Sequence, residues 1–146
     1  MAMSSSLQTS EYLLLFRGAG WEKNLSPQEL QTLMAQWVSW YEGLQRQGKV
    51  KGSNPLFPQG KIVSGKKGKV VADGPFAESK EAIGGYFLIE ASSLDEAIEI
   101  ARGWPILDVG AEVEVRPVAA ACPVFFELDP SACQRLPEAA AAGARV

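Results

Sequence analysis

The segment from Asp73 to Glu90, DGPFAESKEAIGGYFLIE, constrains the fold of this chain more than any other. Its Gly74-Pro75 dipeptide marks a turn between an acidic and an aromatic residue. A charged stretch follows, and the glycine pair Gly84-Gly85 then leads into a run of large apolar residues. A short apolar run bounded by glycines is typical of a buried strand. The segment therefore predicts a turn followed by an interior strand, but it names no reaction.

The composition is that of one ordinary globular domain. The chain has 146 residues, of which 47% are hydrophobic and 21% charged, and its net charge is −3. No global positive field would attract nucleic acid or an anionic membrane. No apolar run approaches the ~20 residues of a membrane span, and the N-terminus lacks the pattern of a secretory signal. We therefore expect a cytoplasmic protein that binds neither nucleic acid directly nor membranes.

The two cysteines, Cys122 and Cys133, lie near the end of the chain. A reduced cytoplasmic protein would leave them as free thiols, whereas a disulfide between them would constrain only the tail. The sequence does not decide whether they pair.

Two segments carry the signals that begin a helix. Residues 26–29, SPQE, provide a capping serine, a proline suited to the first turn and a glutamate that completes a capping box. Apolar residues then recur at steps of three and four as far as Leu44, and Gly48 is expected to end this helix. Residues 93–96 repeat the capping pattern, and residues 103–105, GWP, end the second helix.

Three stretches predict the main strands. Residues 11–17 and 85–91 are apolar on both faces, as strands in the centre of a sheet are. Residues 112–118, interrupted by Pro117, alternate polar and apolar side chains as an edge strand does.

A hairpin and a connection lie between the first helix and the second apolar strand. Ile62-Val63 and Val70-Val71 flank the sequence SGKKG, which predicts a hairpin with a lysine-bearing turn. The surrounding lysines are not interleaved with aromatic residues, so we interpret them as the solvated surface of this hairpin. We expect the Pro- and Gly-rich residues 48–60 to form a connection.

This order of elements predicts an α+β, ferredoxin-like β-α-β-β-α-β domain with an inserted hairpin. We expect residues 11–118 to form the domain, residues 1–10 a disordered leader, and residues 119–146 a partly disordered extension. Two helices cover only one face of a four-stranded sheet. The other face would leave apolar groups in water, at roughly 25 cal/mol per Å². A second copy packed sheet to sheet would cover it, and so would residues 119–136 folded back over it.

The sequence resembles the DGPF branch of the YCII-related proteins from about Glu11 to Val118. The resemblance rests on DGPF at 73–76, AESKE at 77–81, GGY at 84–86, LDEA at 94–97 and VEVRP at 113–117. It implies a ferredoxin-like fold that pairs into a dimeric α/β barrel, and hence a homodimer through the sheet face. Some relatives are thought to use a His–Asp pair, and one group to act as dehydrochlorinases. DGPF members are often encoded beside extracytoplasmic-function sigma factors. This chain has no histidine, so the His–Asp chemistry does not carry over.

Asp73 is the candidate catalytic residue. A carboxylate beside a Gly-Pro turn can accept a proton from a substrate, and it can equally accept backbone amides and fix the turn. Lys80 and Glu81 can form a binding pair or a solvated local ion pair. Phe76, the aromatic residue of the same motif, is a further candidate ligand contact. The pair Gly84-Gly85 can admit a ligand to the backbone or mark a bulge.

Further candidate ligand contacts lie on the predicted strands and near the second helix. Arg17, Tyr86 and Arg116 can together hold a carboxylate or phenolate, although nearby glutamates would also explain the arginines. Of the tryptophans at 21, 37, 40 and 104, Trp104 beside Pro105 best suits a pocket wall, and Trp37 at helical spacing best suits the core.

The residues suggest no metal site and no cofactor, because histidine, calcium-loop spacing and nucleotide-binding glycine motifs are absent from the sequence. Three functions remain open: binding of a small organic molecule, a regulatory partnership with an extracytoplasmic-function sigma factor, and cofactor-free lyase or isomerase chemistry. The last would use Asp73 as base and Tyr86 or an arginine as electrophile.

Overall fold

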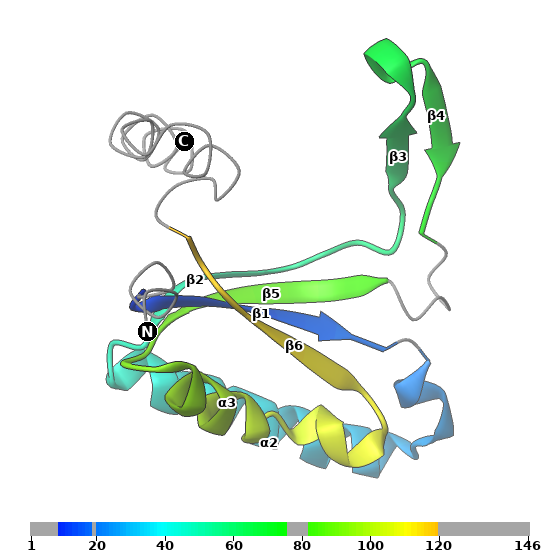
Figure 1. Ribbon diagram of the computed structural model, residues 1–146. Coiled ribbons are helices and arrows are strands. Elements are labelled where there is room, and N and C mark those ends of the chain that lie inside the picture. The colour runs from blue at the N-terminus through cyan, green and yellow to red at the C-terminus, as the bar shows by residue number, and fades with distance from the viewer. Residues whose placement is uncertain (1–8, 19, 76–81, 120–146) are drawn as a thin grey trace.

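A computed structural model of the chain describes residues 9–18, 20–75 and 82–119. Its main body is a four-stranded antiparallel sheet in the order β2-β5-β1-β6, with both helices on one face (Figure 1). The strands are β1 (Glu11–Arg17), β2 (Val50–Pro55), β5 (Ile83–Glu90) and β6 (Glu112–Pro117), and the helices are α2 (Pro27–Arg46) and α3 (Leu94–Arg102). Short 3₁₀ turns lie at η1 (Trp21–Asn24), η2 (Lys66–Gly68) and η3 (Pro105–Val109). This α+β arrangement is consistent with a ferredoxin-like fold.

The two strands that the sequence predicts as central are central. β1 lies between β5 and β6, with Leu14 opposite Phe87 on one side and Val115 on the other. β5 lies between β1 and β2, and the polar-apolar strand β6 lies at an edge, as its alternation predicts.

Both helix starts also form as predicted. Ser26 Oγ accepts the backbone N–H of Glu29 at 3.1 Å, and the Glu29 carboxylate accepts the N–H of Ser26 at 3.0 Å, which completes the capping box. At α3, Ser93 Oγ accepts the N–H of Glu96 at 3.1 Å. Gly48, just beyond α2, has a φ of 70°, a conformation that glycine adopts at little cost.

The prediction that residues 48–60 form only a connection is wrong, because six of them form the edge strand β2. Val50 lies opposite Ile89, and Pro55 lies opposite Gly85. An edge strand pairs on one side only, so its sequence VKGSNP does not need the apolar alternation by which strands are recognised. Pro55 stands at the strand's last position, where a missing N–H is tolerated.

The core lies between the sheet and the two helices. Tyr12, Leu14 and Phe16 alternate along β1 and are buried there, as are Phe87 and Ile89 of β5. Ala97 and Ala101 of α3 and Ile106 of η3 complete this layer. Burying these apolar side chains on one face of the sheet supplies the main drive for folding.

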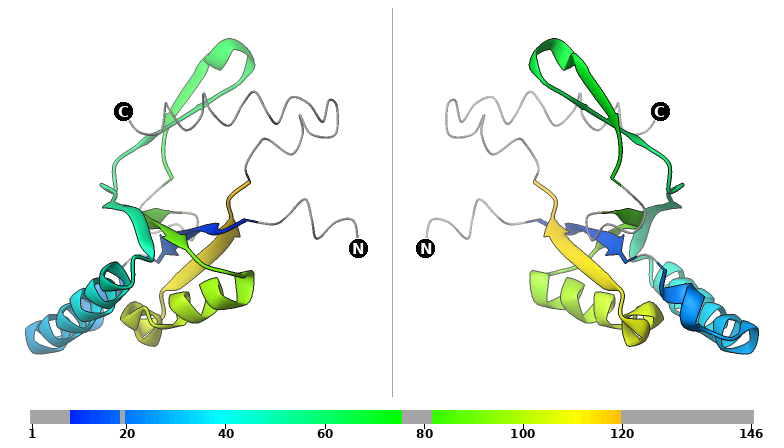
Figure 2. Two further views of the ribbon diagram at one scale, coloured as in Figure 1. Left: turned by 90° about the vertical axis from the view of Figure 1, so that its left-hand side faces the viewer. Right: turned by 90° about the vertical axis from the view of Figure 1, so that its right-hand side faces the viewer.

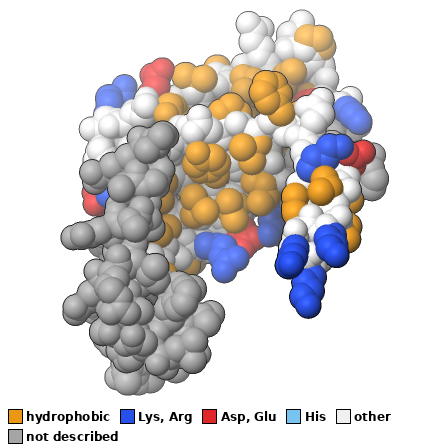
Figure 3. All heavy atoms as spheres, turned by 90° about the horizontal axis from the view of Figure 1, so that it is seen from above, with side chains coloured by type: hydrophobic (Ala, Val, Ile, Leu, Met, Phe, Trp, Pro, Cys, Tyr) orange, Lys and Arg blue, Asp and Glu red, His pale blue; other side chains and the backbone are white. Residues whose placement is uncertain are grey.

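The opposite face of the sheet carries the other half of each central strand. Leu13 lies opposite Leu88, and Leu15 lies opposite Tyr86. We call the face formed by these four half-buried residues the open face. Apolar side chains gather on it in the view from the side away from the helices (Figure 3).

A separate two-stranded sheet stands away from the body. β3 (Lys61–Ser64) and β4 (Val70–Asp73) pair antiparallel, with Val63 opposite Val71, and η2 lies between them. We call residues 61–73 the arm. It projects on the side of the sheet opposite the helices (Figures 1 and 2).

No helix in the described part of the chain is long and apolar enough to cross a membrane. The predicted leader and C-terminal extension lie almost wholly outside the described residues, as do Cys122 and Cys133. Their states therefore stay predictions.

Candidate functional site

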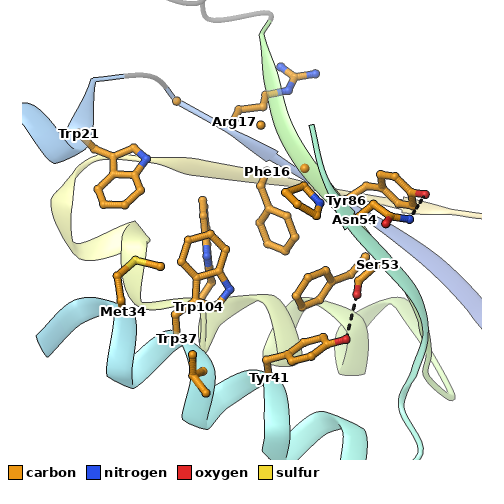
Figure 4. A pocket seen from close by; sticks show the side chains of 16 residues that line it. Phe16, Arg17, Trp21, Met34, Trp37, Tyr41, Ser53, Asn54, Tyr86 and Trp104 are labelled. Carbon is orange, nitrogen blue, oxygen red and sulfur yellow. Dashed lines mark hydrogen bonds between the residues drawn. The ribbon is translucent and has the colours of Figure 1, made fainter. Parts of the chain in front are cut away.

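A cavity of about 450 Å³ opens between α2 and one end of the sheet. The side chains around it come from η1, from α2, from the end of β1, from the end of β2, from the start of β5 and from the residue before η3 (Figure 4). Its aromatic walls are Phe16, Trp21, Trp37, Tyr41, Tyr86, Phe87 and Trp104. A volume of this size suits a drug-sized or smaller organic molecule.

The helix wall of the cavity follows from the helical period. Met34, Trp37, Val38 and Tyr41 are spaced three and four residues apart on α2, so they share one face. That face points toward the sheet end (Figure 4).

The aromatic walls are braced by contacts among themselves. The ring centroid of Phe16 lies 4.8 Å from that of Phe87 and 4.6 Å from that of Trp104. Trp37 meets Trp104 edge to face at 5.7 Å. Such contacts fix ring orientations, so the walls are shaped before any ligand arrives.

The glycine pair at the start of β5 lines the cavity and forms a bulge. Phe16 lies opposite Gly85 while Arg17 lies opposite Ile83, so Gly84 is the extra residue. A Cβ on Gly85 would stand 3.1 Å from the Asn54 carbonyl oxygen, so the backbone of β2 would have to shift to admit it. Gly85 therefore serves the close approach of β2 to β5 beside the cavity, whereas a Cβ on Gly84 would meet only the Phe16 carbonyl oxygen, at 4.0 Å.

Most polar groups of the cavity wall already have partners. The Tyr41 hydroxyl lies 2.9 Å from Ser53 Oγ, and Asn54 Nδ2 donates to the Tyr86 hydroxyl at 2.9 Å. Arg17 forms an ion pair with Glu114 of β6 through Nη2. These pairings hold the side chains in place without supplying free charge to the cavity.

Two N–H donors of the lining residues lack a partner within the described structure. Trp104 is only 3% exposed, and its Nε1 is buried with no acceptor. Arg17 Nε is likewise buried and unpaired, although the far end of its guanidinium binds Glu114. A buried donor without an acceptor costs about 1–3 kcal/mol, and both atoms are buried behind the cavity surface.

The structure brings three of the predicted ligand contacts together: Arg17, Tyr86 and Trp104 all line this cavity. Arg116 does not line it. Its exposed guanidinium lies 3.5 Å from Glu114, so it shares that carboxylate with Arg17. Phe76 and Lys80 lie outside the described residues.

Asp73 lies elsewhere. It ends β4 at the base of the arm, is exposed and forms an ion pair with Lys61. It lines a separate pocket with residues 58–61 and with Gly74 and Pro75, not the aromatic cavity. Within one chain, Asp73 and Tyr86 therefore do not line the same cavity.

Sequence reasoning missed part of the lining. Ser53, Asn54 and Pro55 belong to β2, which the sequence did not reveal as a strand. Trp37 packs against the core, as predicted, but it also lines the cavity. The helical spacing predicts that Trp37 lies on the apolar face of α2. It does not show that this face extends beyond the core and lines a cavity.

A metal centre is not formed by the described residues, among which no three Cys, His, Asp or Glu side chains gather closely enough to hold an ion. Among the described residues, those that line the cavity carry hydroxyls, one amide, one guanidinium and the indole N–H groups of three tryptophans.

The chain was compared with known proteins. Residues 12–120 match the YCII-related domain family. An uncharacterised protein of Rhizobium meliloti (strain 1021) is 47% identical over 51 residues, which cover 34% of this chain and 41% of that protein. The family match extends over most of the chain and includes every element that lines the cavity. The chain belongs to the YCII-related family.

Proposed function

We propose that the protein binds a small organic molecule in the aromatic cavity, without a metal or a nucleotide, and that it does so as a homodimer of the DGPF branch of its family. The observation that carries the proposal is the cavity of about 450 Å³ with seven aromatic residues in its walls, among them the buried Trp104. Concave apolar sites with a few polar groups are where small ligands bind.

The lining also indicates the character of the ligand. Seven aromatic residues favour a flat, largely apolar body. Aromatic faces also attract cations, but among the described residues no Asp or Glu lines the cavity and the one charged lining residue is Arg17. These features favour a neutral or singly anionic aromatic molecule.

The test is a thermal-unfolding screen with probes of matched size: 2-naphthoate, 2-naphthol, 2-naphthyl-trimethylammonium and octanoate. A probe present at about 100 times its Kd should raise the unfolding free energy by about 2.7 kcal/mol and the Tm by roughly 5–10 °C. We expect naphthoate or naphthol to stabilise the protein more than octanoate or the cationic probe.

A pair of tryptophan variants controls the screen. Val38 lines the cavity and is exposed, so Val38→Trp should fill the cavity without disturbing the core and should abolish the shift. Leu94 is an exposed apolar residue of α3 outside the lining, so Leu94→Trp should leave the shift intact. The proposal fails if no probe stabilises the protein, or if Val38→Trp responds as Leu94→Trp does.

The homodimer part of the proposal rests on the open face. Leu13, Leu15, Tyr86 and Leu88 are large apolar or aromatic groups on a face that neither helix covers. Packing two such faces together would remove these groups from water at about 25 cal/mol per Å².

The other two functions stay predictions. A sigma-factor partnership has no observation of its own in the structure. The lyase or isomerase hypothesis gains no support from the position of Asp73, which lies apart from the cavity.

A further inference from the structure

The arm is apolar on both of its faces and exposed along its whole length. Val63 and Val71, directly opposite each other, are 64% and 61% exposed. Ile62 and Val70 point to the other face of the two-stranded sheet and are also exposed. A lone two-stranded hairpin is marginally stable in water, and exposed apolar surface of this kind indicates a binding surface.

The arm borders the open face. It follows β2 and precedes β5, so it leaves the sheet from the side of the edge strand β2. It rises on the side away from the helices (Figures 1 and 2), and from above it stands beside the apolar side chains of the open face (Figure 3). Any body placed on the open face would therefore also meet the arm.

The net charge of the arm is opposite in sign to the net charge of the rest of the chain. Residues 61–73 contain four lysines and one aspartate, a net charge of +3. Because the whole chain carries −3, the other residues together carry −6. The arm of one copy is thus attracted to the body of another copy, and this attraction favours self-association over pairing with a basic partner.

The reach of the arm exceeds the spacing of packed sheets. The four residues of β3 alone span about 13 Å at about 3.3 Å per residue, whereas facing sheets pack about 10 Å apart. An arm of this length does not fit between two facing sheets. It would extend past the partner's sheet and lie along its side.

We propose that the arm clasps a second copy of this chain, which lies with its open face against that of the first. This inference rests on the homodimer part of the proposed function and adds the element that holds the dimer together. In a two-fold symmetric dimer the arm of each copy packs against the other copy. Every contact made by an apolar arm residue therefore occurs twice.

The test is sedimentation equilibrium of the full chain and of Val63→Glu/Val71→Glu. Both valines are exposed within one chain, so the double variant should fold with an unchanged circular dichroism spectrum. Two carboxylates per arm, buried twice in a symmetric dimer, should raise the dimer Kd at least roughly a hundredfold. Leu94→Glu, which charges an exposed apolar residue far from the arm in sequence, should leave the Kd unchanged.

Hydrogen exchange of the same samples gives a second measurement. Amides of β3 and β4 should be protected in the wild-type dimer and should exchange rapidly in the double variant, because an undocked hairpin opens easily.

The possible outcomes distinguish the proposal that the arm clasps the partner from the proposal of a homodimer. A wild-type dimer that the double variant leaves intact, with the arm amides unprotected, would overturn the clasp and leave the homodimer standing. A wild-type chain that stays monomeric at its highest soluble concentration would overturn both. A chain that dimerises only after truncation at Val118 would show that its own C-terminal segment occupies the face, which also overturns the clasp.

Discussion

Glu96 connects the start of α3 to the start of β2. Its carboxylate accepts from Lys49 Nζ at 2.5 Å and from Ser92 Oγ at 2.7 Å. The hydrogen bond from Lys49, followed by that from Ser92, lowers the pKa of Glu96 below its ordinary value of 4.5. A carboxylate with a depressed folded-state pKa stabilises the fold above its unfolded pKa, and this contribution is lost as the pH falls through the folded-state pKa.

Glu96→Gln should therefore lower stability at neutral pH, and the gap from wild type should shrink in acid. Urea unfolding midpoints measured from neutral pH down to below the unfolded pKa of Glu would show this convergence. Glu99→Gln is the control, because Glu99 is an exposed residue of the same helix whose ion pair is with Arg102 on its own helix. A gap for Glu96→Gln that stays constant with pH would contradict the assignment.

At the scale of single elements, the close contact of β2 with β5 depends on Gly85. Replacing it with alanine would put a Cβ 3.1 Å from the Asn54 carbonyl oxygen and 3.3 Å from Pro55 Cα, both of which are backbone atoms. The strand would have to move, and we expect Gly85→Ala to destabilise the protein by about 1–3 kcal/mol. It should also weaken probe binding, because Asn54, Pro55 and Gly85 line the cavity.

Gly43→Ala is the matched control for this prediction. A Cβ at Gly43, inside α2, would meet nothing within 4 Å. Alanine there should stabilise the helix by about 1 kcal/mol. Equal effects of the two substitutions in urea unfolding would mean that the packing of β2 on β5 does not limit stability.

The elements differ in how far the sequence predicts them, and the difference has a physical cause. The capping box at Ser26 and Glu29 is a local interaction, so four residues predict where α2 begins. β1 and β5 are apolar on both faces, so their composition predicts both the strand and its central place. β2 is held by backbone pairing to β5 and carries mostly small or polar side chains, so nothing local marks it as a strand.

The cavity shows the same limit. Trp104 and Tyr86 could be proposed as ligand contacts because they are aromatic residues beside turn or strand signals. Ser53 and Asn54 belong to the cavity wall because β2 pairs with β5 beside the glycine bulge. This pairing joins residues far apart in the sequence, so no local sequence pattern predicts it.

At the scale of the whole molecule, the protein has a cavity at one end of the sheet, and an arm and an open face on the side away from the helices. The cavity is bounded by α2 and by the ends of three strands, so it forms only when the sheet and helix have packed. The arm and the open face carry apolar groups outside this core. One fold thus offers a candidate ligand site and a candidate dimer surface.

The most direct measurement of the central claim uses the four indole N–H groups as reporters. Trp40 Nε1 already donates to the Ile100 carbonyl at 3.2 Å and Trp40 does not line the cavity, whereas Trp104 is part of its wall. Titration of ¹⁵N-labelled protein with 2-naphthoate, with signals assigned from single Trp→Phe variants, should move the Trp104 signal furthest and the Trp40 signal least. Indole signals that all stay in place at saturating naphthoate and naphthol, or a Trp40 signal that moves as far as that of Trp104, would contradict a ligand site in this cavity.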